Sequence, residues 1–231
     1  MVGLRAKDYF AEEVQIRLAE ASARGDVDQI AGLIRQGADV NATGREGMRP
    51  LFWAMSKGSA KGFAFLLENG ADPNVTAESL AKNERPRSVM ELAAIAEKSE
   101  FLVLALKSGG NPNFPVGYGE RTILAEAILN NRTENVRVLI ESGATIDHQD
   151  SGGLTPVLIA AGINNYDMVL FLLGRGADPK IRDRWGYDLA GMMKRYGDRG
   201  IKRNSEQYRW YLKTVAEMER RGLLDTPKAG K

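Results

Sequence analysis

A short phrase recurs along this chain at a nearly constant interval. It reads QGADVN at 36–41, NGADPN at 69–74, GGNPN at 109–113, SGATID at 142–147 and RGADPK at 175–180. Each phrase contains a glycine that is followed directly by Ala or Gly. From one phrase to the next, these glycines lie 33, 39, 34 and 33 residues apart. A period near 33 residues is typical of stacked helical repeats, in which each unit packs only on its neighbours. The sequence therefore predicts an elongated solenoid that offers surfaces rather than one deep pocket.

Each period predicts two antiparallel helices. In the segment 47–74, Pro50 opens the first helix, where its missing N–H costs nothing, and Gly58 allows a tight turn. Gly70 is placed where a left-handed residue ends the second helix. The segment 153–180 repeats this arrangement, with Thr155 expected to cap its first helix through the hydroxyl group. The Asp and Asn residues of the phrases are predicted to form turns rather than metal sites.

This pattern resembles the ankyrin repeat. The family's T-P-L, A-A, L-L and G-A-D-x-N elements are matched by Pro50-Leu51, Leu66-Leu67 and 70–74, and again by Thr155-Pro156, Ala160-Ala161, Leu172-Leu173 and 176–178. The resemblance covers about residues 14–190. It implies an all-α ankyrin-repeat solenoid of about five to six helix–turn–helix units with β-hairpin fingers, closed by a C-terminal capping helix.

We expect one solenoid over residues 1–224, followed by a disordered tail at 225–231. The expected units are an N-terminal cap with repeat 1 (4–42), repeat 2 (43–75), repeat 3 with an insertion (76–114), repeat 4 (115–148), repeat 5 (149–181), and a truncated repeat with the C-terminal cap (182–224). The capping helix is predicted over 204–222, with Asn204 and Gln207 as a capping box. Its expected apolar face comprises Tyr208, Tyr211, Leu212, Val215 and Met218.

Two segments depart from the repeat pattern. The polar insertion 75–88 is either a loop on the binding face or a neutral surface loop. The finger 113–121 carries Phe114 and Tyr118, which either pack on neighbouring side chains or serve as exposed anchors. Trp53 has the same two alternatives, a place near the binding face or burial between units.

The sequence shows none of the familiar residue patterns of enzymes and metal sites. It has no cysteine, which excludes disulfides and thiolate ligands, and its one histidine, His148, has no evident acid–base partner. None of the common phosphate-binding, zinc-protease, calcium-loop or serine-hydrolase motifs is present. We therefore predict no catalytic residue, no metal, no cofactor, no small-molecule substrate and no enzymatic activity. The net charge of +2 gives no reason to expect nucleic acid as a partner.

Ankyrin stacks bind partners through the fingers and the exposed ends of the first helices, which line a concave face. Carried onto this sequence, the resemblance implies the following partner-binding residues: Arg45, Glu46, Met48, Phe52, Ser56, Lys57, Arg85, Arg87, Glu91, Ile95, Tyr118, Arg121, Asn130, Leu154, Leu158, Arg184, Trp185 and Tyr187. Arg, Trp and Tyr are the residue types that dominate the binding energy of protein interfaces.

The whole chain is also similar to bacterial ankyrin proteins that act as immunity partners of secreted toxins, including lipase effectors of type VI secretion. That resemblance implies an inhibitor whose partner is another protein, a toxin effector such as a lipase. It favours a periplasmic location over a cytoplasmic one, with membrane contact only through an N-terminal anchor outside this sequence. The alternative is a general ankyrin scaffold or a regulatory subunit that binds a cytoplasmic protein.

Overall fold

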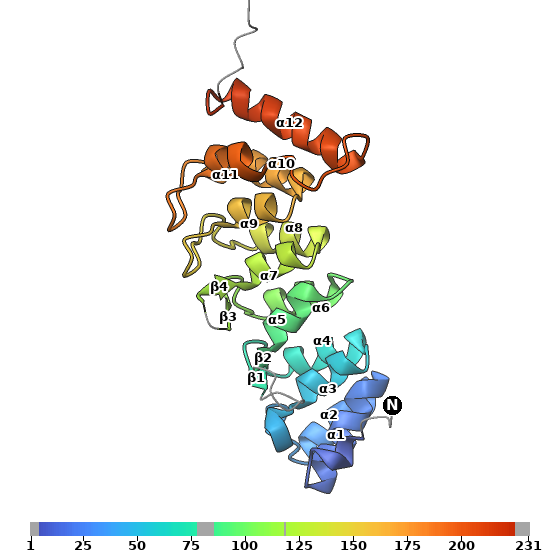
Figure 1. Cartoon of the computed structure of the whole chain (residues 1–231). Coiled ribbons are helices and arrows are strands. Elements are labelled where there is room, and N and C mark those ends of the chain that lie inside the picture. The colour runs from blue at the N-terminus through green and yellow to red at the C-terminus, as the bar shows by residue number, and fades with distance from the viewer. Residues whose placement is uncertain (1–4, 78–85, 118, 225–231) are drawn as a thin grey trace, which may run out of the picture.

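The structure is a computed structural model that describes residues 5–77, 86–117 and 119–224. Within these residues, helices lie in two rows along an elongated stack (Figure 1). The inner row comprises α1 (Glu13–Arg24), α3 (Pro50–Ser56), α5 (Val89–Ile95), α7 (Ile123–Leu129), α9 (Pro156–Gly162) and α11 (Leu189–Tyr196). The outer row comprises α2 (Val27–Arg35), α4 (Ala60–Glu68), α6 (Glu100–Lys107), α8 (Thr133–Glu141) and α10 (Tyr166–Gly174), and α12 (Glu206–Arg220) lies across the far end.

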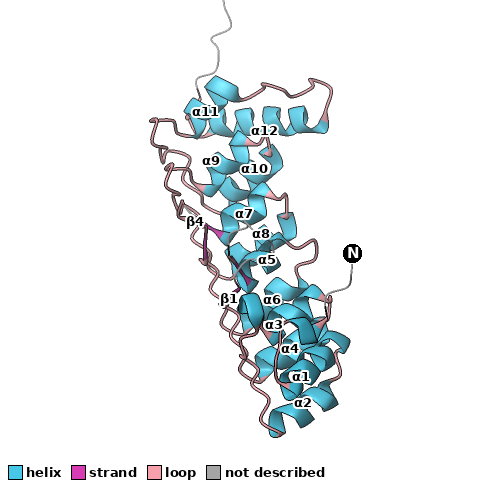
Figure 2. Cartoon of the chain, turned by 60° about the horizontal axis from the view of Figure 1, so that its bottom comes forward, coloured by secondary structure: helices cyan, strands magenta, loops and turns pink. Residues whose placement is uncertain are grey.

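The loops between the helix pairs project along one side of the stack as fingers (Figure 2). Two of them form short antiparallel ladders, β1 (Thr76–Ala77) with β2 (Arg87–Ser88) and β3 (Pro115–Val116) with β4 (Arg121–Thr122). In the first ladder Thr76 is opposite Ser88, so the two described ends of the insertion pair with each other. The 3-10 helices η1 (Ala6–Asp8) and η2 (Arg45–Gly47) complete the elements.

The turn and helix-start predictions hold at most positions. Gly58 and Gly70 have φ values of 74° and 89°, the left-handed region that glycine adopts without strain. The first helices of the units 47–74 and 153–180 begin at Pro50 and Pro156. The prediction for Thr155 is wrong, because its hydroxyl makes no capping bond and is buried without a hydrogen-bond partner.

One continuous hydrophobic core runs through the stack. Leu66, Leu139 and Leu172 of three outer helices are fully buried, as their helical spacing predicts. Along the inner row α1 packs on α3, and α5, α7, α9 and α11 pack in succession. Each unit therefore covers the apolar side of the next, as a solenoid requires.

Asparagine side chains join successive fingers. The Nδ2 atom of Asn74 donates to the carbonyl oxygen of Gly109 at 3.1 Å, and its Oδ1 atom accepts from the N–H of Asn111 at 2.8 Å. Asn41 makes the same pair of bonds to the backbone of Gly70 and Asp72. In four of the five phrases an Asp or Asn side chain accepts from the backbone N–H two residues on, as Asp72 does from Asn74. The polar residues of the phrases therefore form turns, as predicted, and they also link successive units, a role that the sequence pattern did not predict.

The last outer helix, α10, is covered by α12. Thr214 of α12 is buried and donates to the carbonyl oxygen of Tyr166 at 3.3 Å, and the Tyr166 hydroxyl donates to the carbonyl oxygen of Gly197 at 2.7 Å. Burial of this phenol, with smaller effects from Tyr211 and Asp198, raises its pKa to about 12. The hydroxyl therefore stays protonated, as its donor role requires.

Two details of the capping helix differ from the prediction. The N-cap is Ser205, whose hydroxyl accepts from the N–H of Tyr208 at 3.1 Å, so the helix begins one residue later than a box at Asn204 requires. Leu212 is 49% exposed because the buried stripe runs instead through Thr214 and Met218. The predicted disordered tail, 225–231, lies outside the described residues.

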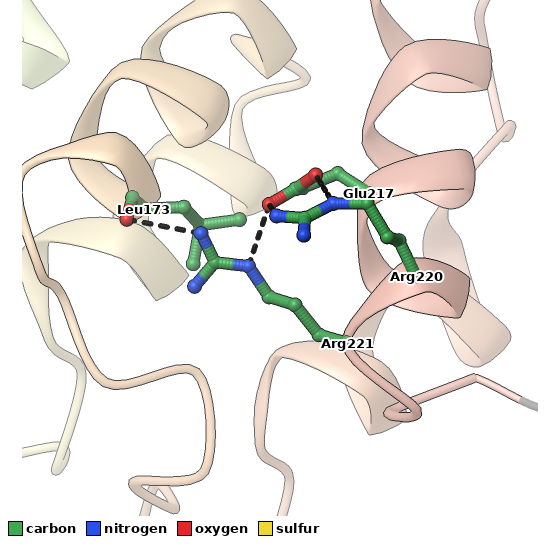
Figure 3. Close-up of polar contacts among 4 residues, drawn as sticks. All are labelled: Leu173, Glu217, Arg220 and Arg221. Atoms are coloured by element: carbon green, nitrogen blue, oxygen red, sulfur yellow. Dashed lines mark hydrogen bonds and ion pairs between the residues drawn. The ribbon is translucent and has the colours of Figure 1, made fainter.

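Hydrogen bonds and ion pairs of charged side chains link α12 to α10 (Figure 3). The Glu217 carboxylate accepts from Arg220 at 2.8 and 2.7 Å and from Nε of Arg221 at 2.7 Å. Arg221 also donates to the carbonyl oxygen of Leu173, at the end of the neighbouring helix, at 3.2 Å. The hydrogen bonds from Arg220, followed in size of effect by the bond from Arg221, lower the pKa of Glu217 to about 2.

Candidate protein-binding surface

The inner helices α7, α9 and α11 and the last two fingers enclose a groove with apolar walls, here called the C-terminal groove. One part, of about 190 Å³, is lined by Leu129, Leu154, Ile159, Ile163 and Met192 among others. A second part, of about 490 Å³, shares Leu154 and Met192 with the first and extends to the last finger. Ile163 is 39% exposed, so the groove floor presents apolar surface to solvent.

The second part of the groove ends in a cluster of aromatic and arginine side chains, here called the aromatic–arginine patch. It consists of Arg184, Trp185, Tyr187, Arg195 and Tyr196. Trp185 is 60% exposed and carries the Arg184 guanidinium 4.2 Å above its ring. Arg195 donates to the hydroxyls of Tyr187 at 2.7 Å and Tyr196 at 2.8 Å, which holds its position. These bonds fix rigid, exposed groups of the types that anchor protein interfaces.

The acidic residues next to the patch are used by the fold. Asp183 is buried, and its Oδ1 atom accepts from the N–H groups of Trp185 and Tyr187, both at 2.9 Å. Asp188 caps α11 through the N–H of Gly191 at 2.9 Å and lies 3.7 Å from Arg182. Among the described residues, no carboxylate lies within ion-pair distance of Arg184 or Arg195. The patch therefore presents uncompensated positive charge.

The structure brings together several of the predicted binding residues at this end of the stack. Leu154 is shared by both parts of the groove, and Trp185 and Tyr187 line the second. Arg184 lies over Trp185. Arg121 lines the first part, 3.5 Å from Glu126 and 3.6 Å from Asp150, so its charge is already compensated.

Four predicted binding residues have buried side chains and offer little surface to a partner: Met48, Phe52, Glu91 and Leu158. Of these, Leu158 lines the first part of the groove. Met48 follows the turn η2, which directs the chain inward, and is 1% exposed in the core. Phe52 and Leu158 lie in helices whose faces are covered by neighbouring units. Glu91 in α5 is buried, and the Nε atom of Arg87 in β2 lies 4.0 Å from its Oε1 atom.

The other described predicted residues do not line the groove. Arg45 and Glu46 are exposed in η2, and Ser56 and Lys57 are exposed at the end of α3. Ile95 is partly buried at the end of α5, and Asn130 is exposed after α7. Arg85 and Tyr118 lie outside the described residues.

The structure also decides two alternatives that the sequence left open. Trp53 is buried, with its ring centroid 5.9 Å from that of Tyr9, so its place is between units. Phe114 is partly buried and packs against the core. Both aromatic side chains therefore have structural roles.

Sequence reasoning missed Ile163, Met192, Arg195 and Tyr196. Ile163 is an apolar residue at the end of a helix, where solvent exposure is expected. Met192 and Tyr196 are four residues apart on α11, which places them on one face of that helix. This face of the last inner helix is the signal that identifies the groove.

No group of three or more metal-ligating His, Cys, Asp or Glu side chains occurs within residues 5–77, 86–117 and 119–224. No helix in these ranges combines the length and hydropathy needed to span a bilayer.

The model of the family described as ankyrin repeats (3 copies) matches residues 90–183. Protein PhlB of Serratia liquefaciens is 33% identical over 149 residues, which cover 64% of this chain and 63% of that protein. An L-asparaginase of Dirofilaria immitis is 27% identical over 170 residues, 72% of this chain but 27% of the enzyme. The chain thus spans less than two thirds of these relatives.

Solved structures share the architecture. The crystal structure of the ankyrin repeat protein EF0377 superposes with a TM-score of 0.69 at 25% identity, covering 90% of this chain and 99% of that one. An ankyrin repeat domain from Acinetobacter baumannii superposes with a TM-score of 0.68, also at 25% identity, covering 86% of this chain and 97% of that domain.

Proposed function

Because this chain is built from ankyrin repeats, which bind other proteins, we propose that it binds a protein partner through the C-terminal groove and blocks that partner's activity. The observation that carries the proposal is the position of the exposed large apolar side chains. Of the four such residues in the described chain, Ile163, Trp185 and Tyr196 line the groove, and Leu212 lies elsewhere on α12. Exposed apolar side chains gathered in one hollow mark an interaction site.

The specific form of the proposal is an immunity protein that covers the active site of a secreted toxin, such as a lipase effector. One apolar groove at one end of the stack suits one dominant partner. A rigid inhibitor has no need of catalytic groups, so binding rather than catalysis is the role we propose. A periplasmic location accompanies this proposal.

A scaffold or regulatory subunit is the second candidate. Arg45, Glu46 and Lys57 in the second unit are exposed polar residues outside the groove, and they would be available to a second protein. A scaffold would hold two partners at once, whereas an inhibitor would hold one.

The test is capture of partners from native cells with the immobilised chain, followed by mass spectrometry. We expect one dominant protein, whose toxicity or enzymatic activity falls when this chain is added. Trp185→Ala should reduce its capture strongly, while Leu212→Ala, which removes an exposed apolar side chain outside the groove, should not. Equal capture by the two variants would contradict the groove as the binding site, and two partners held together would favour the scaffold.

A further inference from the structure

The C-terminal groove combines an apolar floor with a cationic end, and this combination restricts the partner that it fits. Ile163 and Met192 lie in the first part of the groove, and Trp185 and Tyr196 lie in the second. A side chain that enters the first part meets apolar walls. The adjoining residues of the same segment then lie over the aromatic–arginine patch.

The arginines of the patch are held in place for an anionic ligand. Arg195 uses Nε and Nη1 on the two tyrosine hydroxyls, which leaves its Nη2 group for a ligand. Arg184 stacks on Trp185, and no hydrogen bond or ion pair occupies its guanidinium nitrogens in the described chain. Arg199 lies 5.7 Å from the Tyr196 ring and adds a third cation. Guanidinium groups bind carboxylates through paired, charge-assisted hydrogen bonds.

Nearby carboxylates do not cancel this charge. Asp183 is buried and occupied by two backbone N–H groups, and Asp188 faces Arg182. Asp198 is near enough to Tyr166 and Tyr211 to contribute to their raised pKa values, and within the described residues it forms no ion pair with Arg184 or Arg195. Positive charge next to the groove therefore has no internal partner, and complementarity favours a negative one.

We propose that the C-terminal groove binds an acidic protein segment, in which one apolar side chain enters the groove and adjacent carboxylates contact Arg184 and Arg195. The proposal rests on the protein-binding function proposed above and adds the chemistry of the partner. The apolar floor distinguishes such a segment from nucleic acid, which would need a longer basic track along the fingers. The chain as a whole has a net charge of only +2, so the positive charge is local.

The probe is a phage-displayed library of random linear peptides, selected on the immobilised full chain. We expect the enriched peptides to contain more Asp and Glu than the starting library, next to a Leu, Phe, Trp or Tyr. A labelled peptide from this pool, measured by fluorescence anisotropy, should bind about 30-fold more weakly to Trp185→Ala, the loss typical of an interface anchor. Replacing its Asp and Glu by Asn and Gln should weaken it about tenfold or more.

A matched pair of variants separates local charge from net charge. Arg184→Glu with Arg195→Glu should lose the acidic peptides and select basic ones. Arg137→Glu with Arg175→Glu makes the same change in net charge on the outer helices, where both guanidiniums stack on Phe171, and should keep the acidic peptides. If circular dichroism shows that the charge-reversed variant is unfolded, Arg184→Gln with Arg195→Gln replaces it, and this variant should also lose the acidic peptides.

Several results would overturn the inference. These are no enrichment of peptides, enrichment without an acidic excess, equal loss in both charge-reversed variants, or binding of single-stranded DNA or anionic vesicles in place of peptides. The proposed function would survive such a result if capture of the native partner still depended on Trp185. If Trp185→Ala captured the native partner as well as the wild type does, the proposed function itself would be contradicted.

Discussion

At the N-terminal end of the concave face, Arg45, Glu46 and Ser56 are exposed, while Met48 and Phe52 are buried beneath them. At the C-terminal end the exposed side chains are Trp185 and Tyr196, beside an apolar groove. The two ends have the same helix pairs and fingers, because the repeated phrase sets the backbone of both. The residues between the phrases determine the surface, so similar folding does not mean similar binding.

The largest expected effect is on the free energy of unfolding, and it compares core packing in an early and a later helix pair of the stack. Leu66 in the second helix pair and Leu139 in the fourth are both fully buried. Each Leu→Ala change should lower the free energy of unfolding by about 2–5 kcal/mol, because it leaves a cavity between packed helices. Urea unfolding followed by circular dichroism measures this. A cost below roughly 1 kcal/mol at either site would mean that packing at that end is looser than the structure shows.

A smaller effect distinguishes the links between fingers. Asn74 both donates and accepts, whereas Asp147 at the equivalent place accepts from the N–H of Asp178 at 3.0 Å and has no N–H group to donate. Asp147→Asn should add a donor toward the next finger and raise the unfolding free energy by about 0.5–1 kcal/mol. Asn74→Asp should lower it by about the same amount. Thermal and urea unfolding of the two variants measure this, and a change of the same sign in both would contradict the proposed link.

The smallest effect concerns the two ends of the stack. Glu217 connects with Arg220 and with Arg221, which reaches α10, whereas the Arg5–Asp8 pair lies within one turn. Since the pKa of Glu217 falls from its usual 4.5 to about 2, its ionised form is stabilised in the folded protein. That contribution is fully present above about pH 4.5 and is lost as the pH falls through about 2.

The measurement is the melting temperature of the wild type and of Glu217→Gln between neutral pH and pH 2. The difference between the two proteins should be constant above about pH 4.5 and disappear near pH 2. Asp8→Asn should give a smaller pH-dependent difference in melting temperature, because Asp8 pairs with Arg5 in the same turn and links no second helix. A difference for Glu217→Gln that persists at the lowest pH would show that the side chain acts through packing instead.

The sequence predicted the backbone better than the surface. Pro50, Gly58 and Gly70 mark a helix start and two turns through local conformational preferences, which do not depend on the neighbouring unit. Exposure does depend on that unit, because a finger or the next helix covers residues such as Glu91 and Leu158. Thr155 illustrates the same limit, since its type favours capping but its hydroxyl is buried without a partner.

The groove required knowledge of several units together. Arg184 and Trp185 were identified from the last finger, but Ile163 and Met192 come from two different inner helices. Their contribution depends on how closely α9 and α11 pack, which no single repeat specifies.

The links between units join residues that are near each other in the sequence, for example Asn41 with Gly70 and Asn74 with Gly109, 29 and 35 positions apart. A chain with contacts of this kind can gain structure progressively as it leaves the ribosome, because no distant segment must arrive first. The exception is the final helix, since Thr214 contacts Tyr166 across 48 positions. Until synthesis passes residue 214, the apolar side of α10 is bare, and a premature stop codon upstream should leave a product prone to aggregation.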